Sequence, residues 1–450
     1  MRIHFIAIGG SAMHNLALAL KNSGHIISGS DDEIFEPSRS RLDSQGLLPE
    51  KFGWFPEKLD DQIDIIILGM HAKPDNPELL KAHDIGLEIV SYPEFLYQQS
   101  VNKKRIVIGG SHGKTTVTSM IMYVLSKMGI DFDYMVGSKI KGFDIMVRLS
   151  DAPIIILEGD EYLSSPIDRR PKFHWYKPHL AVLTGIAWDH INVFPTFENY
   201  IWQFEEFVDL MVDGGKLFYY EDDTVLGKVV ENTKVGIDKF SYGLPENEII
   251  NGVTSVVDDN IRIPLSVFGD HNLINMNAAM LICNELGINR TEFFETIKTF
   301  DGASNRLELI NKTAGSYVYK DFAHAPSKVI ATVKAVRNQF PDKNFVACLE
   351  LHTFSSLNRE FLVQYANSLD LADKACVYFS NHALKLKRLP ELDKQDIFIA
   401  FDNNNLEVFN DSAEMQNWLL GQEKKNIVFL MMSSGNFDGI NLEDFSQSLI

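Results

Sequence analysis

The stretch Gly110-Ser111-His112-Gly113-Lys114-Thr115-Thr116 constrains the fold of this chain more than any other segment. It follows an apolar run at 105–108. After it, apolar residues recur at three- and four-residue spacing until Gly129, as they do on one face of a helix. A strand, a glycine-rich turn and a helix in this order predict an α/β domain.

The same stretch predicts a phosphate site. Backbone N–H groups can surround a phosphate where the residues are small, and the start of a helix adds positive potential. Lys114 can neutralise terminal phosphate oxygens, and the Thr115 hydroxyl can hold Mg²⁺. We therefore expect residues 110–116 to bind ATP or GTP. Three residues separate Gly109 from Gly113 where four are usual, so the loop is a variant of the common spacing.

Length and charge bound the class of protein. A chain of 450 residues can form about three domains. Its net charge of −19 argues against a general nucleic-acid or anionic-membrane binder. The three cysteines are widely spaced, which argues against a disulfide framework or a zinc site. The chain starts directly in a predicted strand, and its apolar runs are too short to cross a membrane. We expect a cytoplasmic protein that acts on small molecules.

The N-terminal segment reads as a strand, helix and strand at residues 2–8, 12–20 and 25–28, which predicts a Rossmann-like domain. The turn after the first strand does not complete a GxGxxG pattern, so a nucleotide-like ligand is favoured over NAD. Asp31 follows the second strand, where an acidic side chain commonly meets a ribose hydroxyl. The residues alone leave a second role open for Asp31, as a cap of a helix or turn.

Two later strands are predicted to end in groups suited to metal chemistry. Residues 154–157 lead into Glu158-Gly159-Asp160-Glu161, and residues 180–183 are soon followed by Asp189-His190. Both groups lie where a parallel sheet presents its carboxyl edge. The strand and helix pattern begins again near residue 305. We predict three domains, at residues 1–101, 102–304 and 305–450.

Six segments, taken in order, resemble the motif series of the Mur ligase family: Gly110–Thr116, Glu158–Glu161, Asp189-His190, Gly269–Asn275, Asn305–Glu308 and Asp321–His324. The resemblance spans nearly the whole chain. It implies an α/β protein of three domains. These are a Rossmann-like N-terminal domain that binds a UDP-sugar, a central P-loop domain that binds ATP, and a C-terminal α/β ligase domain.

The N-terminal part resembles the branch of this family that starts from UDP-N-acetylmuramate. The resemblance implies a UDP-sugar site at Gly9, Gly10, Ser11, Ser30 and Asp31. It also implies an ATP-dependent ligase with Mg²⁺ as cofactor. The muramate carboxylate is activated as an acyl phosphate, and an amine then attacks this intermediate to form an amide. Neither a nucleic acid nor a membrane is expected as a partner, and the oligomeric state is not predicted.

Two amine substrates occur among the members of this branch. One is the recovered tripeptide L-Ala-γ-D-Glu-meso-diaminopimelate, and the other is the L-alanine used in de novo wall synthesis. Residues 30–37, 160–173 and 433–440 resemble the members that use the tripeptide. Ala325 also lacks a His that is common in the L-alanine-adding members, whereas His352 resembles those members. We expect the tripeptide, with L-alanine as the alternative.

The resemblance implies roles for residues of the central domain. Lys114 holds the β- and γ-phosphates, Thr115 and Glu158 reach one Mg²⁺, and His190 helps to place a second ion. Imidazole is an unusual ligand for so hard an ion, so the residue type alone gives His190 little support. No lysine that could be carbamylated, as in several relatives, occurs in residues 199–203.

The resemblance assigns further ATP and amine contacts to His271, Asn272, Asn275, Arg306, Asp321 and His324. The first three would lie near adenine, although the residues alone also suit the capping of a predicted helix at 272–286. Arg306 would grip the γ-phosphate when the last domain closes, Asp321 would bind the ribose, and His324 would orient or deprotonate the amine. A non-catalytic nucleotide-binding regulator is an alternative of another class. It would not need Lys114, Glu158, His190, Arg306 and Asp321 together.

Overall fold

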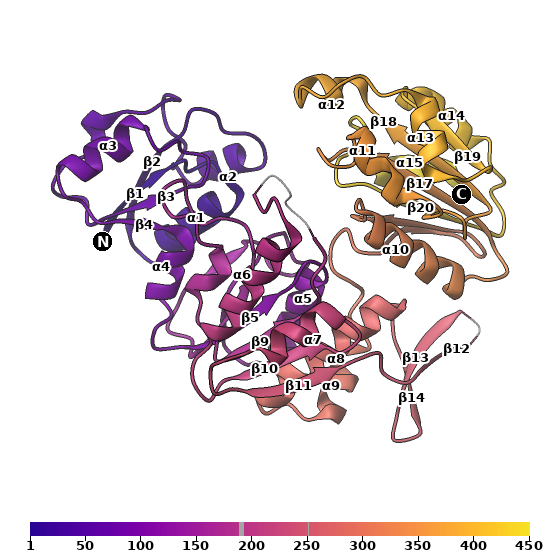
Figure 1. Ribbon diagram of the computed structural model, residues 1–450, viewed down its shortest axis with the longest axis horizontal. Coiled ribbons are helices and arrows are strands. Elements are labelled where there is room, and N and C mark those ends of the chain that lie inside the picture. The colour runs from indigo at the N-terminus through magenta and orange to yellow at the C-terminus, as the bar shows by residue number, and fades with distance from the viewer. Residues whose placement is uncertain (189–192, 251) are drawn as a thin grey trace. The chain divides into compact units, whose positions relative to one another are not determined.

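The computed structural model describes residues 1–188, 193–250 and 252–450, which form two compact units (Figure 1). The first unit comprises Met1–Gly243 and Asn275–Phe293, and the second comprises Leu244–Ile274 and Phe294–Ile450. Helix α8, Asp270–Glu285, begins in the second unit and ends in the first.

The first unit opens with a parallel sheet of four strands in the order β2-β1-β3-β4. The strands are Arg2–Ile6 (β1), Ile26–Ser30 (β2), Ile65–Leu68 (β3) and Ile89–Ser91 (β4). The helices between and after them are Ser11–Asn22 (α1), Ser38–Ser44 (α2), Pro77–Asp84 (α3) and Tyr92–Gln98 (α4), with a short 3-10 turn at Pro56–Lys58. This alternation confirms the predicted Rossmann-like unit.

The first strand is shorter than the predicted strand at 2–8. Ala7 has a φ of 69°, which an extended strand does not allow, so the chain turns there. The backbone N–H groups of Ala7 and Ile8 both donate to the Ser30 carbonyl, at 2.9 and 3.2 Å. This turn brings Gly9 to the end of β2.

The central sheet has seven strands in the order β11-β10-β9-β5-β8-β6-β7. The strands are Lys104–Gly109 (β5), Asp133–Met135 (β6), Val147–Arg148 (β7), Ile154–Glu158 (β8), Leu180–Leu183 (β9), Lys216–Tyr220 (β10) and Asp238–Tyr242 (β11). The helices are Lys114–Lys127 (α5), Phe197–Asp209 (α6) and Thr224–Glu231 (α7), with a 3-10 turn at Lys172–Trp175. All pairs except β6 with β7 are parallel, so the ends of β5, β8 and β9 meet at one edge.

The second unit contains two sheets. A small antiparallel sheet, which we did not predict, holds Asn247–Ile250 (β12), Val253–Asp258 (β13) and Ile261–Pro264 (β14). The larger sheet has the order β15-β16-β20-β17-β18-β19, with an antiparallel edge pair β15/β16. Its strands are Glu308–Lys312 (β15), Tyr317–Asp321 (β16), Asn344–Leu351 (β17), Lys374–Phe379 (β18), Leu406–Phe409 (β19) and Ile427–Met432 (β20).

The helices after residue 286 complete the second α/β pattern. They are Arg290–Ile297 (α9), Pro326–Gln339 (α10), Arg359–Leu362 (α11), Asn381–Leu386 (α12), Lys394–Phe401 (α13), Ser412–Leu420 (α14) and Leu442–Leu449 (α15), with a 3-10 turn at Val363–Tyr365. The predicted helix at 272–286 is confirmed as α8, within one or two residues at each end.

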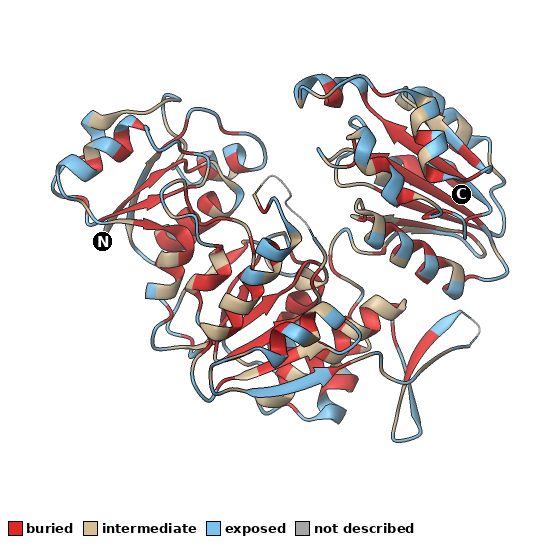
Figure 2. Ribbon diagram, in the orientation of Figure 1, coloured by how far each residue is buried: buried red, intermediate tan, exposed pale blue. Residues whose placement is uncertain are grey.

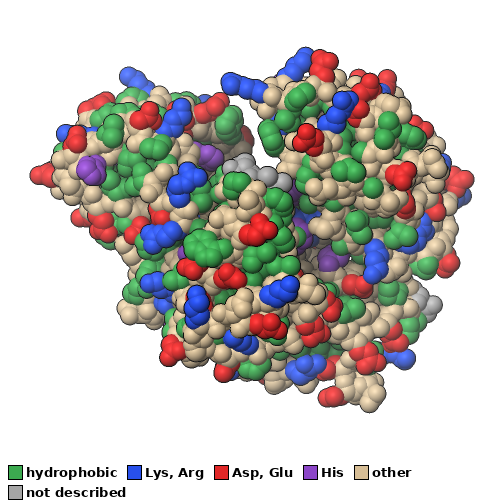
Figure 3. Space-filling view, viewed as in Figure 1, with side chains coloured by type: hydrophobic (Ala, Val, Ile, Leu, Met, Phe, Trp, Pro, Cys, Tyr) green, Lys and Arg blue, Asp and Glu red, His purple; other side chains and the backbone are tan. Residues whose placement is uncertain are grey.

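Buried apolar side chains follow the strands of the large sheets in both units (Figure 2). β3, β9 and β20 are buried along their whole lengths, as expected for strands covered on both faces. Acidic and basic side chains are interspersed over the face drawn in Figure 3. In the parts of the chain that the structure describes, no helix combines the length and apolar character needed to cross a membrane.

Candidate active site

The glycine-rich loop between β5 and α5 has the geometry of a phosphate cradle. Gly110 and Gly113 have φ values of 122° and 83°, which residues other than glycine rarely adopt. A Cβ atom on Gly113 would lie 2.5 Å from the Asn275 side-chain oxygen. The fold therefore leaves no room for larger residues here, and it places Asn275 beside the loop. The Ser111 N–H donates to the Gly185 carbonyl at 2.9 Å, which ties the loop to the end of β9.

Lys114 begins α5 and is held by two acceptors inside the first unit. Its ammonium group donates to the Gly110 carbonyl at 2.5 Å and to Glu161 Oε2 at 2.7 Å. Burial alone would lower the pKa of Lys114, but neighbouring carboxylates, above all Glu161, raise it above its usual value. Lys114 therefore stays charged at neutral pH, as a phosphate ligand must.

Glu158 lies at the end of β8 and faces the start of α5. Its Oε1 accepts the Thr115 hydroxyl at 2.8 Å, and its Oε2 accepts the Gly137 N–H at 3.0 Å. Carboxylate and hydroxyl oxygens are ligands that Mg²⁺ prefers, usually with phosphate oxygens and water completing the shell. Among the residues placed in the structure, no three His, Cys, Asp or Glu side chains form a metal cluster of their own. The pair of Thr115 and Glu158 thus fits Mg²⁺ that arrives with a nucleotide.

Asp160 and Lys172 form a second ion pair beside the first, at 2.5 Å. Although burial acts in the opposite direction, Lys172 and Lys114 lower the pKa of Asp160 well below its usual value. Lys172 begins the 3-10 turn directly after Pro171, and a bridge between Leu163 and Pro171 closes the loop before it. Sequence reasoning did not assign Asp160 or Lys172 to the site as individual residues, because only the folded loop returns Lys172 to Asp160.

The expected UDP-sugar residues meet at the ends of β1 and β2. The Gly9 N–H donates to Asp31 Oδ2 at 2.7 Å, and a Cβ atom on Gly9 would lie 2.9 Å from the same oxygen. Gly10 precedes the first turn of α1, Ser11 is exposed at the start of that helix, and Ser30 is buried. Burial raises the pKa of Asp31 to about 6, against the effect of the Gly9 hydrogen bond.

This raised pKa predicts a pH-dependent stability difference between the wild type and Asp31→Asn. The folded state holds the proton more tightly than the unfolded state, so the stability contributed by protonated Asp31 is lost as the pH rises from about 4 to about 6. Asparagine carries no charge in either state. After allowance for solvent screening, the free energy of unfolding of the variant, relative to that of the wild type, should rise by about 1–2 kcal/mol between pH 4.0 and pH 6.5. Urea unfolding at both pH values measures this difference, and an equal difference at both would contradict the prediction.

In the second unit, Arg306 and Asp321 lie close together at the start of the larger sheet. Asp321 Oδ2 accepts the Leu307 N–H at 2.7 Å, and Oδ1 accepts the Ala323 N–H at 2.6 Å. The Arg306 guanidinium carbon lies 4.6 Å from the centre of the Phe322 ring. His324 contacts the Phe322 carbonyl through Nδ1 at 2.7 Å. These hydrogen bonds fix the Asp321 carboxylate where β16 ends.

The remaining predicted residues are placed as follows. His112 contacts the Ser111 carbonyl through Nδ1 at 2.7 Å, and Thr116 is buried in the first turn of α5. His271 and Asn272 belong to the start of α8 in the second unit, whereas Asn275 belongs to the first. Burial lowers the pKa of His271. Asp189-His190 falls outside the described residues.

The end of β17 carries a buried carboxylate that organises the loop after β20. Glu350 Oε2 accepts the Phe437 N–H at 2.8 Å and the Ser433 hydroxyl, and Oε1 lies 3.5 Å from His352 Nδ1. Burial alone would raise the pKa of Glu350, but the hydrogen bonds from His352, Ser433 and Phe437 lower it below its usual value. A Cβ atom on Gly435 would lie 2.7 Å from the His352 ring, so glycine is needed at that position.

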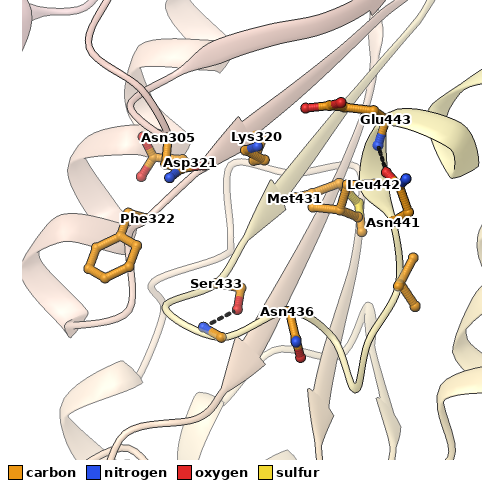
Figure 4. A pocket seen from close by; sticks show the side chains of 12 residues that line it. Asn305, Lys320, Asp321, Phe322, Met431, Ser433, Asn436, Asn441, Leu442 and Glu443 are labelled. Atoms are coloured by element: carbon orange, nitrogen blue, oxygen red, sulfur yellow. Dashed lines mark hydrogen bonds between the residues drawn. The ribbon is translucent and has the colours of Figure 1, made fainter. Parts of the chain in front are cut away.

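A cavity of about 280 Å³ adjoins this loop (Figure 4). In Figure 4, Asp321 and Phe322 border it from the end of β16, Ser433 and Asn436 from the loop, and Glu443 from the start of α15. The full lining is Asn305, Lys320, Asp321, Phe322, Met431, Ser433, Gly435, Asn436, Ile440, Asn441, Leu442 and Glu443. The lining mixes apolar and polar side chains and carries both signs of charge, on Lys320, Asp321 and Glu443, as suits a charged small molecule.

Two family models match the chain. The catalytic domain of the Mur ligase family matches residues 2–104, and the Mur ligase middle domain matches residues 108–283. A UDP-N-acetylmuramate–L-alanine ligase from Paenarthrobacter aurescens is 30% identical over 386 residues, covering 84% of this chain and 82% of that protein. The chain belongs to the Mur ligase family. It is an ATP-dependent carbon–nitrogen ligase with the three-domain α/β architecture of that family.

Other Mur ligases cover the chain more fully. A UDP-N-acetylmuramate–L-alanine ligase from Sulfurihydrogenibium sp. is 29% identical over 444 residues, or 97% of this chain and 95% of that protein. The structure of UDP-N-acetylmuramate-alanine ligase from Thermotoga maritima has a TM-score of 0.72 at 20% identity and covers 100% of this chain and 98% of its own. At this identity the likeness establishes the fold.

Solved structures of Mur ligases that are named for a peptide substrate are also similar to this chain. A murein peptide ligase from Psychrobacter arcticus 273-4 has a TM-score of 0.64 at 23% identity, covering 100% of this chain and 98% of its own. The UDP-N-acetylmuramate:L-alanyl-γ-D-glutamyl-meso-diaminopimelate ligase from Neisseria meningitides has a TM-score of 0.59 at 26% identity. It covers 66% of this chain and 98% of its own. Relatives named for L-alanine and relatives named for the peptide therefore both resemble this Mur ligase.

Proposed function

We propose that this Mur ligase joins the carboxylate of UDP-N-acetylmuramate to the amine of L-Ala-γ-D-Glu-meso-diaminopimelate, using ATP and Mg²⁺. A carboxylate oxygen attacks the γ-phosphorus and ADP leaves, which gives an acyl phosphate. The amine nitrogen then attacks the acyl carbon, phosphate leaves, and the nitrogen loses a proton. This sequence forms one amide and consumes one ATP.

The contacts around the glycine-rich loop support the proposed roles in the first step. Residues Gly110–Thr116 bind the phosphates, with Lys114 on the β- and γ-phosphates and Asn275 beside the loop. Thr115 and Glu158, which already share a hydrogen bond, hold one Mg²⁺, and His190 helps to hold a second. Bound Mg²⁺ neutralises charge on the phosphate oxygens.

Residues of the second unit are proposed to complete the ATP and amine sites. Arg306 contacts the γ-phosphate, Asp321 the ribose, and His271 and Asn272 the adenine. His324 orients the amine or takes its proton. Gly9, Gly10, Ser11, Ser30 and Asp31 bind the UDP-sugar. We also retain domain boundaries near residues 101 and 304 as part of this proposal.

The choice of the tripeptide rests on the cavity beside the loop at 433–440. Its lining includes Lys320, Asn436 and Asn441, which can bind carboxylates and amides remote from the reacting amine. L-alanine is too small to use such remote groups, whereas the tripeptide presents several. Binding energy from remote groups can orient the attacking nitrogen, so it raises kcat/KM and not only the affinity.

We predict that the purified enzyme prefers the tripeptide to L-alanine by at least about a hundredfold in kcat/KM, or about 3 kcal/mol of transition-state binding. The assay offers each amine with ATP, Mg²⁺ and UDP-N-acetylmuramate, and detects the UDP-linked product by mass. Asn436→Ala should lower kcat/KM for the tripeptide and leave the L-alanine rate unchanged. Efficient joining of L-alanine with no tripeptide product would reject this choice.

The second candidate is a UDP-N-acetylmuramate–L-alanine ligase. The relatives from Paenarthrobacter and Sulfurihydrogenibium, which are named for this activity, favour it, and so does the resemblance of His352 to the L-alanine-adding members. The parallel amine assay separates the two candidates directly. The regulator that the sequence left open is not retained, because the chain belongs to a family of ligases.

A further inference from the structure

Glu161 is the carboxylate partner of Lys114, the residue that is proposed to bind the terminal phosphates. Its side chain is 2% exposed, and its Oε2 accepts the Lys114 ammonium at 2.7 Å. A bound polyphosphate and the Glu161 carboxylate would therefore compete for one cation. Glu161 belongs to the predicted Glu158–Glu161 motif, but the proposed mechanism gives it no role.

Tyr200 holds Glu161 in this position from α6. The Tyr200 hydroxyl donates to Glu161 Oε1 at 3.0 Å and lies 2.9 Å from the Ser111 hydroxyl. Ser111 in turn accepts the Ala187 N–H at 2.9 Å, just after β9. Tyr200 is fully buried, so these contacts are made away from water, where a hydrogen bond orients its partners strongly. The network links the glycine-rich loop to the segment that leads into Asp189-His190.

The charges around the loop leave an excess of carboxylates. Glu158, Asp160 and Glu161 lie within the same edge of the sheet as two ammonium groups, Lys114 and Lys172, and both ammonium groups already have carboxylate partners. A nucleotide without a metal ion brings several further negative charges. It would meet the Glu161 carboxylate at short range, where repulsion between like charges is strong.

We infer that Glu161, positioned by Tyr200, is a resident counter-ion of Lys114 that makes the site select metal-bound over metal-free nucleotide. Mg²⁺ removes much of the nucleotide's charge and so reduces its repulsion by Glu161. Without the ion, the Glu161 carboxylate stays paired with Lys114, and the nucleotide binds weakly. The inference rests on the proposed phosphate role of Lys114, and it adds a residue that discriminates between two forms of the nucleotide.

The test is a titration of the full-length protein with ADP by calorimetry, once with excess MgCl₂ and once with EDTA. The wild type should bind ADP much more weakly in EDTA. Glu161→Gln keeps the size of the side chain and an acceptor for Lys114, but removes the charge. This variant should bind metal-free ADP about tenfold more tightly, with a much smaller change for Mg-ADP, so the ratio of the two dissociation constants falls.

Tyr200→Phe tests the positioning part of the inference. It should lower the same ratio by about threefold, because Glu161 loses a hydrogen bond that fixes it on Lys114. Combining it with Glu161→Gln should add nothing further, because Tyr200 acts through the Glu161 carboxylate. Matched controls are Tyr220→Phe, which removes a 3.0 Å bond to Asp222, and Glu285→Gln, which removes a 2.8 Å ion pair with Lys216. Both should leave the ratio unchanged.

Three outcomes would overturn the inference. An unchanged ratio in Glu161→Gln would show that the carboxylate does not discriminate. Weaker binding of Mg-ADP, with metal-free ADP unaffected, would instead make Glu161 a metal ligand. No binding of ADP by the wild type in either condition would reject the phosphate site itself, and with it the proposed function. The first two results leave the proposed function intact.

Discussion

Lys114→Ala is expected to lower kcat/KM for ligation by at least about a thousandfold. The ammonium group meets negative charge that moves between phosphate oxygens in the transition state, and the ammonium group beside it among the described residues, that of Lys172, is already paired with Asp160. Lys114 begins α5 directly after the left-handed Gly113, so its ammonium position is set by the loop. Product formation and ADP release, measured under saturating substrates, give the comparison.

The same variant leaves the buried Glu161 carboxylate without its cation, which should reduce the free energy of unfolding by about 2–3 kcal/mol. Lys114→Ala combined with Glu161→Gln should recover that stability and still be inactive. Lys127→Ala, at the exposed C-terminal end of the same helix, is the matched control for activity. Near-normal ADP release by Lys114→Ala with unchanged circular dichroism would reject the role of Lys114.

Glu158→Gln is expected to lower kcat by about a hundredfold and to raise the Mg²⁺ concentration for half-maximal rate by at least about tenfold. Glutamine has nearly the same shape but only one acceptor oxygen, whereas Glu158 accepts from both Thr115 and Gly137 and is proposed to hold Mg²⁺. The variant therefore loses a charge at the metal and one of two bonds that orient the side chain. Initial rates over a range of free Mg²⁺ at saturating ATP measure both effects.

Glu285→Gln is the control here, because it removes a carboxylate of the same unit that is paired with Lys216, at the start of β10 and thus at the opposite edge of the parallel sheet from Thr115. Its Mg²⁺ titration should coincide with that of the wild type. If the titration of Glu158→Gln also coincided with the wild type, Glu158 would be a structural residue that only anchors Gly137 and Thr115.

Local sequence patterns predicted the parts of this protein whose structure depends on neighbours along the chain. The apolar run at 105–108, the glycines at 110 and 113 and the periodic run after them specify β5, the loop and α5, because strand, turn and helix preferences act over a few residues. The motif order along the chain likewise predicted the Mur ligase family. The start of β1 was predicted correctly, but its end was not. Ala7 adopts a left-handed conformation there, and an alanine side chain does not indicate such a turn.

Only the tertiary structure decided which of these segments meet. Glu161, Tyr200 and Ser111 lie far apart in the sequence, yet a single hydroxyl joins them, because α6 packs against the edge where β5, β8 and β9 end. The pairing of Asp160 with Lys172 depends in the same way on a closed loop. Residue types and spacing thus determined the fold class and the glycine-rich loop by local preferences. The partner of each buried charge was decided by packing, since a buried carboxylate or ammonium must find its counter-ion wherever the fold places one.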